Sequence, residues 1–369
     1  MILGIDASTY LEELAHGAKY YDGDREIDPL DEFVKNGVNH IRIRVWNNPY
    51  SPDGEPYLAG TTDLDNYVKL GKLAKAKGYH LYMDLHYSDF WADPGKQFIP
   101  KAWEGYTLDE LVEAVYSFTK HCLEVAKREG VAPEMIQVGN EITNGILWPV
   151  GKLWMDDKRG NYENFARLIS SGCRACREVL PEAKIMLHLE KSNDKEIYQE
   201  FFTEMEKAGV DFDIIGASYY PFWHGLPEEM LDNLRACRRF GKKIMISELG
   251  YGFTTEGYFI KGKECRLVVD ESLSRVPGFT DVYPMSPEGQ RSFIHYLMKR
   301  IREEASTASS IGSPFGSPAR AFAGRLKQGR STFMRKENPL ITNGQISASL
   351  IMREESFLPL MSSNNGRKA

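Results

Sequence analysis

Seven short apolar runs alternate with amphipathic segments along most of this 369-residue chain. The runs are rich in Ile, Val, Leu and Met, as expected of parallel strands that are buried on both faces. They cover Ile2–Ser8, His40–Trp46, His80–Tyr87, Met135–Asn140, Lys184–Leu189, Phe212–Tyr219 and Lys243–Glu248. Strands that alternate with helices indicate an α/β fold with a parallel sheet, and a count close to eight favours a (β/α)8 TIM barrel.

Helix signals lie between these runs. Thr107 and Glu110 have the spacing of a capping box, and apolar residues follow them at helical spacing. Pro287 comes after Ser286 and suits the first position of another helix. An open doubly wound sheet is the alternative architecture. It is disfavoured because the first run leads into Asp6–Thr9 and not into a glycine-rich phosphate loop.

Composition and charge indicate neither a nucleic-acid partner nor a membrane-spanning segment. A formal charge of −6 and a pI near 5.9 give no indication of nucleic acid, and no apolar run approaches the length of a membrane span. The N-terminus reads as a strand and not as a signal segment, so a cytoplasmic location is expected as written, and a secreted one if the gene starts upstream. Cys173 and Cys176 form a Cys-x-x-Cys within a helical pattern, which favours buried thiols over a zinc or redox site.

Two glutamates close strand-like runs. Glu141 ends the run that starts at Met135, and Glu248 ends the run that starts at Lys243. Because active sites of barrels gather at the C-terminal ends of the strands, these carboxyl groups are expected to attack and protonate one glycosidic bond. Asn140, directly before Glu141, is placed to donate to a sugar 2-hydroxyl.

Further polar and aromatic residues follow the same runs. Arg42 and Arg44 share one strand parity, and Arg44, nearer the strand end, is expected to hold a carboxylate nucleophile ionised; a structural ion pair is the alternative. His86 ends a run before an acidic, aromatic loop and reads equally as a core or a site residue. Aromatic rings that can stack on the C–H faces of sugars crowd the loops: Trp91, Trp103, Trp148, Trp154, Tyr220, Phe222 and Trp223.

Five segments carry a resemblance to a known family: residues 41–47, 86–97, 138–142, 217–225 and 246–248. They resemble glycoside hydrolase family 53, the arabinogalactan endo-β-1,4-galactanases of the large retaining (β/α)8 clan. The resemblance runs from about Ile2 to Glu304, and the stretch Ser-Asp-Phe-Trp-Ala-Asp-Pro at 88–94 is its most specific part.

The resemblance implies roles for individual residues. Glu141 matches the general acid/base and Glu248 the nucleophile of a retaining double displacement on β-1,4-galactan or galacto-oligosaccharides, with no cofactor required. Further matched positions bind substrate or orient the carboxylates: Arg44, His86, Asp89, Trp91, Asp93, Asn140, Trp148, Tyr219, Trp223 and His224. Some relatives bind a structural calcium after the seventh strand, but residues 251–283 show no convincing ligand cluster, so no metal ligands are assigned. Another β-glycanase or β-galactosidase of the clan, or an inactive carbohydrate-binding remnant, is the alternative.

The alternating pattern stops after Glu304. Residues 305–369 are rich in Ser, Gly and Arg, which predicts a barrel domain at 1–304 and an irregular tail at 305–369, with the eighth strand missing or disordered. The tail can be back-translated and reread in a frame in which each new codon starts on the third base of the old one. In that frame residues 342–353 permit the peptide EWANQCLFDYE and residues 315–319 permit the peptide WEPC. Both peptides resemble the usual C-terminal motifs of the family. We therefore expect a frameshift between about Ala305 and Ser313, and incompatible codons in the gene would contradict it.

Overall fold

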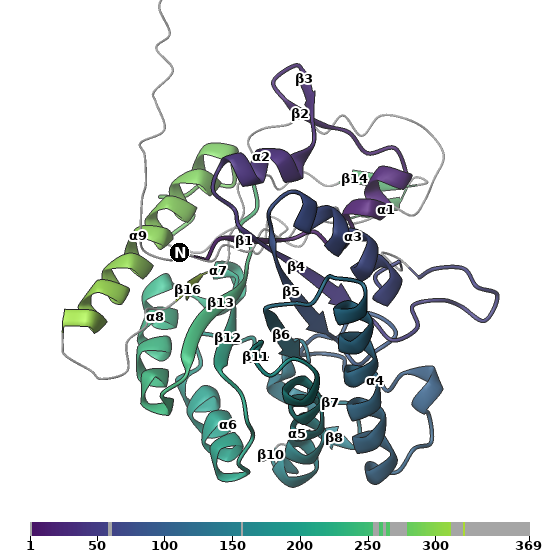
Figure 1. Ribbon diagram of the computed structural model, residues 1–369. Coiled ribbons are helices and arrows are strands. Elements are labelled where there is room, and N and C mark those ends of the chain that lie inside the picture. Colours follow the sequence, from purple (N-terminus) through teal and green to yellow (C-terminus); the bar gives the residue numbers. More distant parts are fainter. Residues whose placement is uncertain are drawn as a thin grey trace, which may run out of the picture.

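A parallel sheet forms the centre of the molecule in the computed structural model, which describes residues 2–57, 61–155, 158–253, 258–260, 263–265, 279–310 and 320–321. Its strands stand in the order β1-β4-β5-β6-β11-β12-β13-β16, and every neighbouring pair is parallel. They are β1 (Gly4–Asp6), β4 (His40–Val45), β5 (His80–Leu85), β6 (Met135–Val138), β11 (Lys184–Leu189), β12 (Ile214–Tyr219), β13 (Lys243–Leu249) and β16 (Arg320–Ala321). The sheet curls and the helices lie outside it (Figure 1), which confirms the barrel architecture.

The helices follow the strands as the sequence predicts. They are α1 (Tyr10–Ala15), α2 (Pro29–Lys35), α3 (Leu64–Ala76), α4 (Leu108–Arg128), α5 (Tyr162–Val179), α6 (Lys195–Lys207), α7 (Pro221–His224), α8 (Pro227–Ala236) and α9 (Pro287–Ser310). The capping box of Thr107 and Glu110 is formed at the start of α4. Helix α9 continues past Glu304 to Ser310, because the residues between contain neither proline nor glycine.

Short 3-10 helices and two-stranded hairpins lie in the connections between the barrel elements. In the part of the chain that the structure describes, 3-10 helices lie at Lys101–Trp103, Ile142–Asn144 and Cys237–Phe240. Hairpins there pair β2 (Tyr20–Asp22) with β3 (Arg25–Ile27), β7 (Gly145–Ile146) with β8 (Gly151–Lys152), β9 (Trp154–Met155) with β10 (Lys158–Arg159), and β14 (Tyr258–Ile260) with β15 (Lys263–Cys265). The β7–β8 hairpin lies in the loop that follows β6 and therefore borders the C-terminal edge of the sheet.

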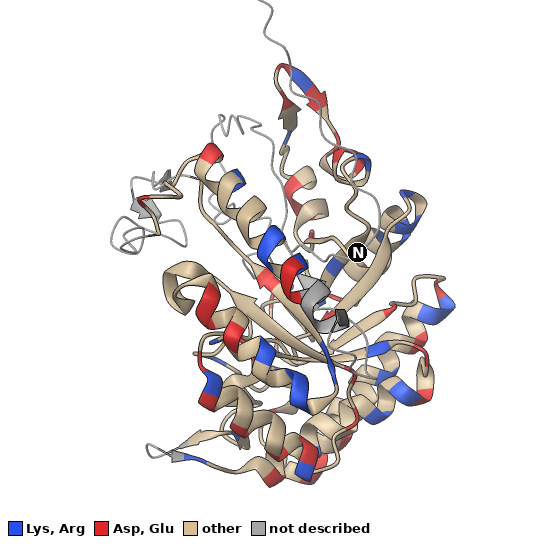
Figure 2. Ribbon diagram, turned by 90° about the vertical axis from the view of Figure 1, so that its left-hand side faces the viewer, with Lys and Arg blue, Asp and Glu red and all other residues tan. Residues whose placement is uncertain are grey.

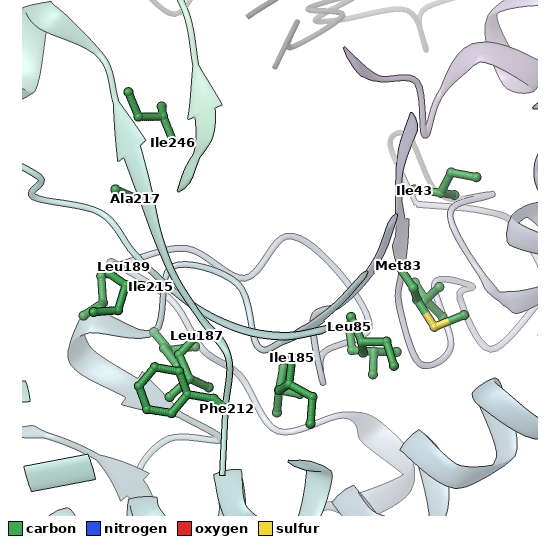
Figure 3. Close-up of a cluster of buried hydrophobic side chains, with 14 of the residues drawn as sticks. Ile43, Met83, Leu85, Ile185, Leu187, Leu189, Phe212, Ile215, Ala217 and Ile246 are labelled. Atoms are coloured by element: carbon green, nitrogen blue, oxygen red, sulfur yellow. The ribbon is translucent and has the colours of Figure 1, made fainter. Parts of the chain in front are cut away.

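Strand alternation separates the core from the barrel interior. Apolar side chains such as Ile43, Met83, Ile185 and Leu187 lie on the outer side of the curled sheet and pack under the helices (Figure 3). Their neighbours along the strands face inward, and Arg42 accordingly contacts side chains from several strands. Lys and Arg alternate with Asp and Glu over the outer helices (Figure 2). In the part of the chain that the structure describes, no helix is both long and apolar enough to span a membrane.

Only two described residues occupy the place of an eighth strand. Arg320 and Ala321 pair with Met245 and Ile246 of β13. Within the described ranges no ladder joins β16 to β1, so the sheet is open there, in agreement with the expected missing strand. The remainder of the tail beyond Ser310, on which the frameshift prediction depends, lies outside the described residues.

A glycine inside α5 tests how closely this helix approaches the sheet. A Cβ on Gly172 would lie 2.8 Å from Tyr87 Oη and 2.9 Å from Val138 Cγ1, both of them buried. Alanine gains about 1 kcal/mol of helix propensity, but overpacking a core costs about 1–3 kcal/mol. We expect Gly172→Ala to lower the free energy of unfolding measured in urea, whereas Gly160→Ala, where a Cβ meets nothing within 4 Å, leaves it unchanged. Equal stability of the two variants would contradict the close packing.

Candidate active site

The structure brings together the two glutamates at the C-terminal edge of the barrel. Glu141 follows β6, and Glu248 lies in β13. Ser218 of β12 connects them, since it is the register partner of Glu248 and its Oγ donates to Glu141 Oε1 at 2.6 Å. Burial raises the pKa of Glu141, and the nearby charge of Glu248 raises it further.

A bulge in β13 turns Glu248 into the barrel. The register moves from Ala217 opposite Ile246 to Ser218 opposite Glu248, so Ser247 is an extra residue on β13. Strict alternation would place Glu248 on the same side as Ile246, under the helices. The bulge therefore supplies the inward orientation that a nucleophile needs.

Glu248 is held as a carboxylate. Arg42 Nη2 lies 2.9 Å from its Oε1, and the Tyr220 hydroxyl donates to its Oε2 at 2.7 Å. Burial of the carboxyl group acts to raise its pKa, but the charge of Arg42 and the hydrogen bond from Tyr220 outweigh burial and lower the pKa. An ionised, buried carboxylate is the form that can attack an anomeric carbon.

Glu141 has the opposite environment. Burial and then the negative charge of Glu248 raise its pKa well above the usual range, and the hydrogen bond from Ser218 offsets this only in part. The resulting neutral carboxylic acid can donate a proton. Its backbone is left-handed, with φ of 47°, a conformation that non-glycine residues adopt mainly at constrained functional positions.

The ion pair predicted for Arg44 is instead made by Arg42. Arg44 Nη2 lies 3.3 Å from Asp6 Oδ1, and its guanidinium stacks 4.0 Å from the centre of the Trp91 ring. Strand parity places both arginines inside the barrel but does not specify their reach. The guanidinium of Arg42, one layer deeper, extends to Glu248, while the indole ring covers Arg44 at the rim.

Tyr219 likewise does not face the carboxyl groups. Its hydroxyl donates to the Gly225 carbonyl at 3.0 Å, and its ring belongs to the core under the helices. The next residue, Tyr220, faces inward and contacts Glu248. A shift of one residue reverses the side of a strand, so this assignment was wrong by one position.

His86 and Asn140 complete the buried network below the carboxyl groups. The His86 Nδ1 accepts from the Ala92 backbone N–H at 3.1 Å, so its Nε2 carries the proton and donates to Asp84 at 2.9 Å. Asn140 Oδ1 accepts from Arg42 Nη2 at 2.8 Å, and its Nδ2 donates to the Ala92 carbonyl. Both side chains therefore fasten the loop after β5 to the charged centre.

Comparisons with known proteins agree with this geometry. The sequence matches the family model for glycosyl hydrolase family 53 over residues 2–325. The chain belongs to this family. A Niallia circulans protein described as uncharacterized is 39% identical over 306 residues, covering 82% of this chain and 79% of that protein. An endo-β-1,4-galactanase of Bacillus subtilis is 32% identical, covering 81% and 66%. The family 53 catalytic domain of Ignisphaera aggregans superposes with a TM-score of 0.73 at 38% identity, covering 82% of this chain and 81% of that domain.

Three tryptophans assigned to the cleft of this family 53 chain retain exposed surface. Trp91 is partly buried against Arg44, and Trp148 is fixed by a hydrogen bond from its Nε1 to the Asn144 carbonyl at 2.9 Å. Trp223 is 45% exposed and packs edge-on against Tyr220, with ring centres 5.5 Å apart. The three rings belong to segments that follow three different strands of the barrel, β5, β6 and β12.

Three other assigned residues fasten loops. Asp89 accepts hydrogen bonds from the backbone N–H groups of Asn48 and Lys101, both within 2.9 Å. Asp93 accepts from the Gly95 N–H and pairs with a neighbouring lysine. The Nδ1 of buried His224 accepts from a backbone N–H at 3.0 Å, and burial lowers its pKa to about 4. The groups that these three side chains contact therefore belong to the protein's own loops.

Two residues near Glu141 escaped the sequence analysis. His188 contacts Ser218 Oγ through Nε2 at 2.9 Å and Asn140 Oδ1 through Nδ1 at 3.1 Å, and burial lowers its pKa to about 4. Glu190 is buried, and burial raises its pKa to about 7. Both residues lie at the end of β11. His86 was identified because it is a polar residue at the end of a strand-like run, and the same criterion applied to β11 would have identified His188 and Glu190.

The described part of the chain contains no group of three His, Cys, Asp or Glu side chains suited to a metal ion. Most of residues 251–283, where a calcium was considered, lies outside the described ranges. Cys173 and Cys176 are free and buried on α5, where burial raises the pKa of both thiols, to about 12 for Cys173. They are structural thiols of the family 53 barrel.

The hydroxyl of Tyr220 gives a test of how Glu248 is kept ionised. Tyr220→Phe removes a hydrogen bond to a charged group, worth about 1.5–3 kcal/mol, so we expect kcat/KM for glycoside hydrolysis to fall about tenfold or more. The pKa of Glu248 rises, and since activity appears as pH rises through this pKa, the acidic limb of the pH profile moves to higher pH. As a control, Tyr219→Phe removes a tyrosine hydroxyl that contacts the Gly225 carbonyl and not Glu248, and it leaves the acidic limb of the pH profile in place. An unmoved acidic limb in Tyr220→Phe would contradict this role.

Proposed function

We propose that this chain hydrolyses internal β-1,4-galactosidic bonds of galactan or galacto-oligosaccharides with retention of configuration. The observation that carries the proposal is the pair of carboxyl groups with opposite pKa shifts, Glu248 lowered and Glu141 raised, in a family 53 barrel. The choice of galactan draws support from the Bacillus subtilis relative, whose name is endo-β-1,4-galactanase.

The first step joins the sugar to the protein. Glu248 attacks the anomeric carbon while Glu141 gives its proton to the departing glycosidic oxygen, and the leaving part of the chain is released as an alcohol. This geometry requires carboxyl groups about 5–5.5 Å apart. Ester formation removes the charge of Glu248.

The second step reverses the role of Glu141. Burial and then the charge of Glu248 raise the pKa of Glu141, so loss of that charge lowers the pKa once the ester has formed. Glu141, now a carboxylate, takes a proton from the water that attacks the anomeric carbon, and Glu248 departs. Side chains and water balance both steps, so the proposed reaction requires no cofactor.

One observation favours an alternative, carbohydrate binding without catalysis. Glu248 lies on β13, and only two described residues pair with the far side of that strand. Purified chain that binds β-1,4-galactan in calorimetry without releasing reducing ends would support this alternative. Release from mannan or cellulose but not from galactan would indicate another hydrolase of the clan.

Substitution of each glutamate separates the two roles. Glu141→Gln is expected to lower kcat on galactan by about 10²–10⁴-fold, because proton donation is lost. On a dinitrophenyl β-galactoside the leaving group needs no proton, so Glu141→Gln still gives a rapid burst of one dinitrophenol per protein, whereas Glu248→Gln gives none.

The control for this pair is Glu129→Gln, which alters an exposed ion pair with Lys72 and leaves both activities unchanged. Proton NMR of the first product reports the stereochemistry. A product first seen as the α-anomer, or wild-type rates in both glutamate variants, would overturn the proposed mechanism.

A further inference from the structure

A single buried glutamine connects the acid/base to an exposed aromatic residue. Gln97 Nε2 donates to the Asn140 carbonyl at 2.8 Å and approaches the Glu141 carbonyl at 3.5 Å. The side chain of Gln97 is therefore fixed against the backbone that carries Glu141. Phe98, the next residue, turns away from this contact and is 60% exposed.

Phe98 lies beside Trp148 in a defined register. The two residues form a parallel bridge, and the Trp148 backbone N–H donates to the Gln97 carbonyl at 2.7 Å. Bridge partners in parallel strands direct their side chains to the same side. The Trp148 ring is further held by the Asn144 carbonyl at its edge and by Lys152 Nζ, 4.7 Å from its centre. An exposed phenyl ring thus stands next to an indole ring whose orientation is set.

The position of these rings relative to the two carboxyl groups indicates which part of the substrate they meet. The nucleophile contacts the sugar that stays on the protein, and the proton donor contacts the oxygen that leaves. Trp223 packs on Tyr220, beside Glu248, and so borders the retained sugar. Phe98 and Trp148 are joined instead, through Gln97, to the backbone of Glu141, the residue that meets the departing oxygen.

We propose that Phe98 and Trp148 form a stacking platform for a galactosyl ring on the leaving side of the scissile bond. The inference rests on the proposed function and adds a site to it. A galactosyl ring has an apolar face of C–H groups at carbons 3, 4 and 5, because its 4-oxygen is axial on the opposite face. An exposed phenyl ring beside an oriented indole offers that face a dry, flat surface. In the second step the same platform binds an acceptor sugar in competition with water.

Two substrates that differ only in the leaving part test the platform. Galactan and long galacto-oligosaccharides place a sugar on the leaving side, whereas β-galactobiosyl fluoride releases only fluoride. We expect Phe98→Ala and Trp148→Ala to lower kcat/KM on galactan about three- to tenfold, the size of an aromatic contact, and to leave hydrolysis of the fluoride unchanged. The fraction of galactobiosyl groups transferred to added galactobiose, measured against hydrolysis, falls in parallel.

Two control variants show whether the effect comes from the aromatic ring at this position. Phe98→Tyr keeps the ring and restores both the galactan activity and the transfer ratio. Tyr106→Ala removes another exposed ring, 40% accessible and two residues before α4, and changes neither the galactan activity nor the transfer ratio. Equal losses on galactan and on the fluoride would place the rings on the retained side or in a structural role, and unchanged kinetics on both would remove the site altogether. Failure of the wild-type chain to cleave either substrate would instead overturn the proposed function.

Discussion

The buried guanidinium of Arg42 is the interaction on which the rest of the site depends. It contacts Asp6 of β1 at 3.1 Å, Asp84 of β5 at 2.6 Å and Glu248 of β13 at 2.9 Å. Removal of one partner from a buried ion pair costs about 3–5 kcal/mol, so one charge binds three strands that do not pair with one another in the sheet. The sheet must curl for carboxylates from such distant strands to reach the same cation.

The charge of Arg42 also gives the two glutamates different protonation states. Glu248 touches the cation directly, whereas the hydrogen bond given to Glu141 comes from the neutral hydroxyl of Ser218. The lowered pKa of Glu248 keeps it negative, and its negative charge then raises the pKa of Glu141. Two identical side chains acquire opposite proton affinities because only one of them lies against Arg42. No further acid or base is required to explain the assignment of roles.

Hydrophobic patterning predicted the architecture well, since strands buried on both faces must be apolar runs; β11 has the predicted ends, and β4 and β5 differ only at their C-termini. Parity also showed that Arg42 and Arg44 face inward. It could not show which one reaches Glu248, because reach depends on depth in the barrel and on the Trp91 ring above Arg44. The error at Tyr219 has a different origin, since Tyr219 and Tyr220 are the same residue type and differ in the side of the strand from which they project.

Within the described residues the sheet ends at the two-residue β16, and this edge and the chemistry of the site are physically separable. Glu248 is oriented by the β13 bulge against β12, by Arg42 from β4 and by the Tyr220 hydroxyl. The bulge and the Tyr220 hydroxyl act from the β12 side of β13, whereas Arg42 reaches Glu248 across the barrel interior, and none of these three contacts involves β16. An incomplete edge exposes backbone N–H and C=O groups to pairing with other chains, which threatens solubility and stability before it disturbs the carboxylates. Loss of activity in such a barrel is therefore expected to accompany aggregation or unfolding.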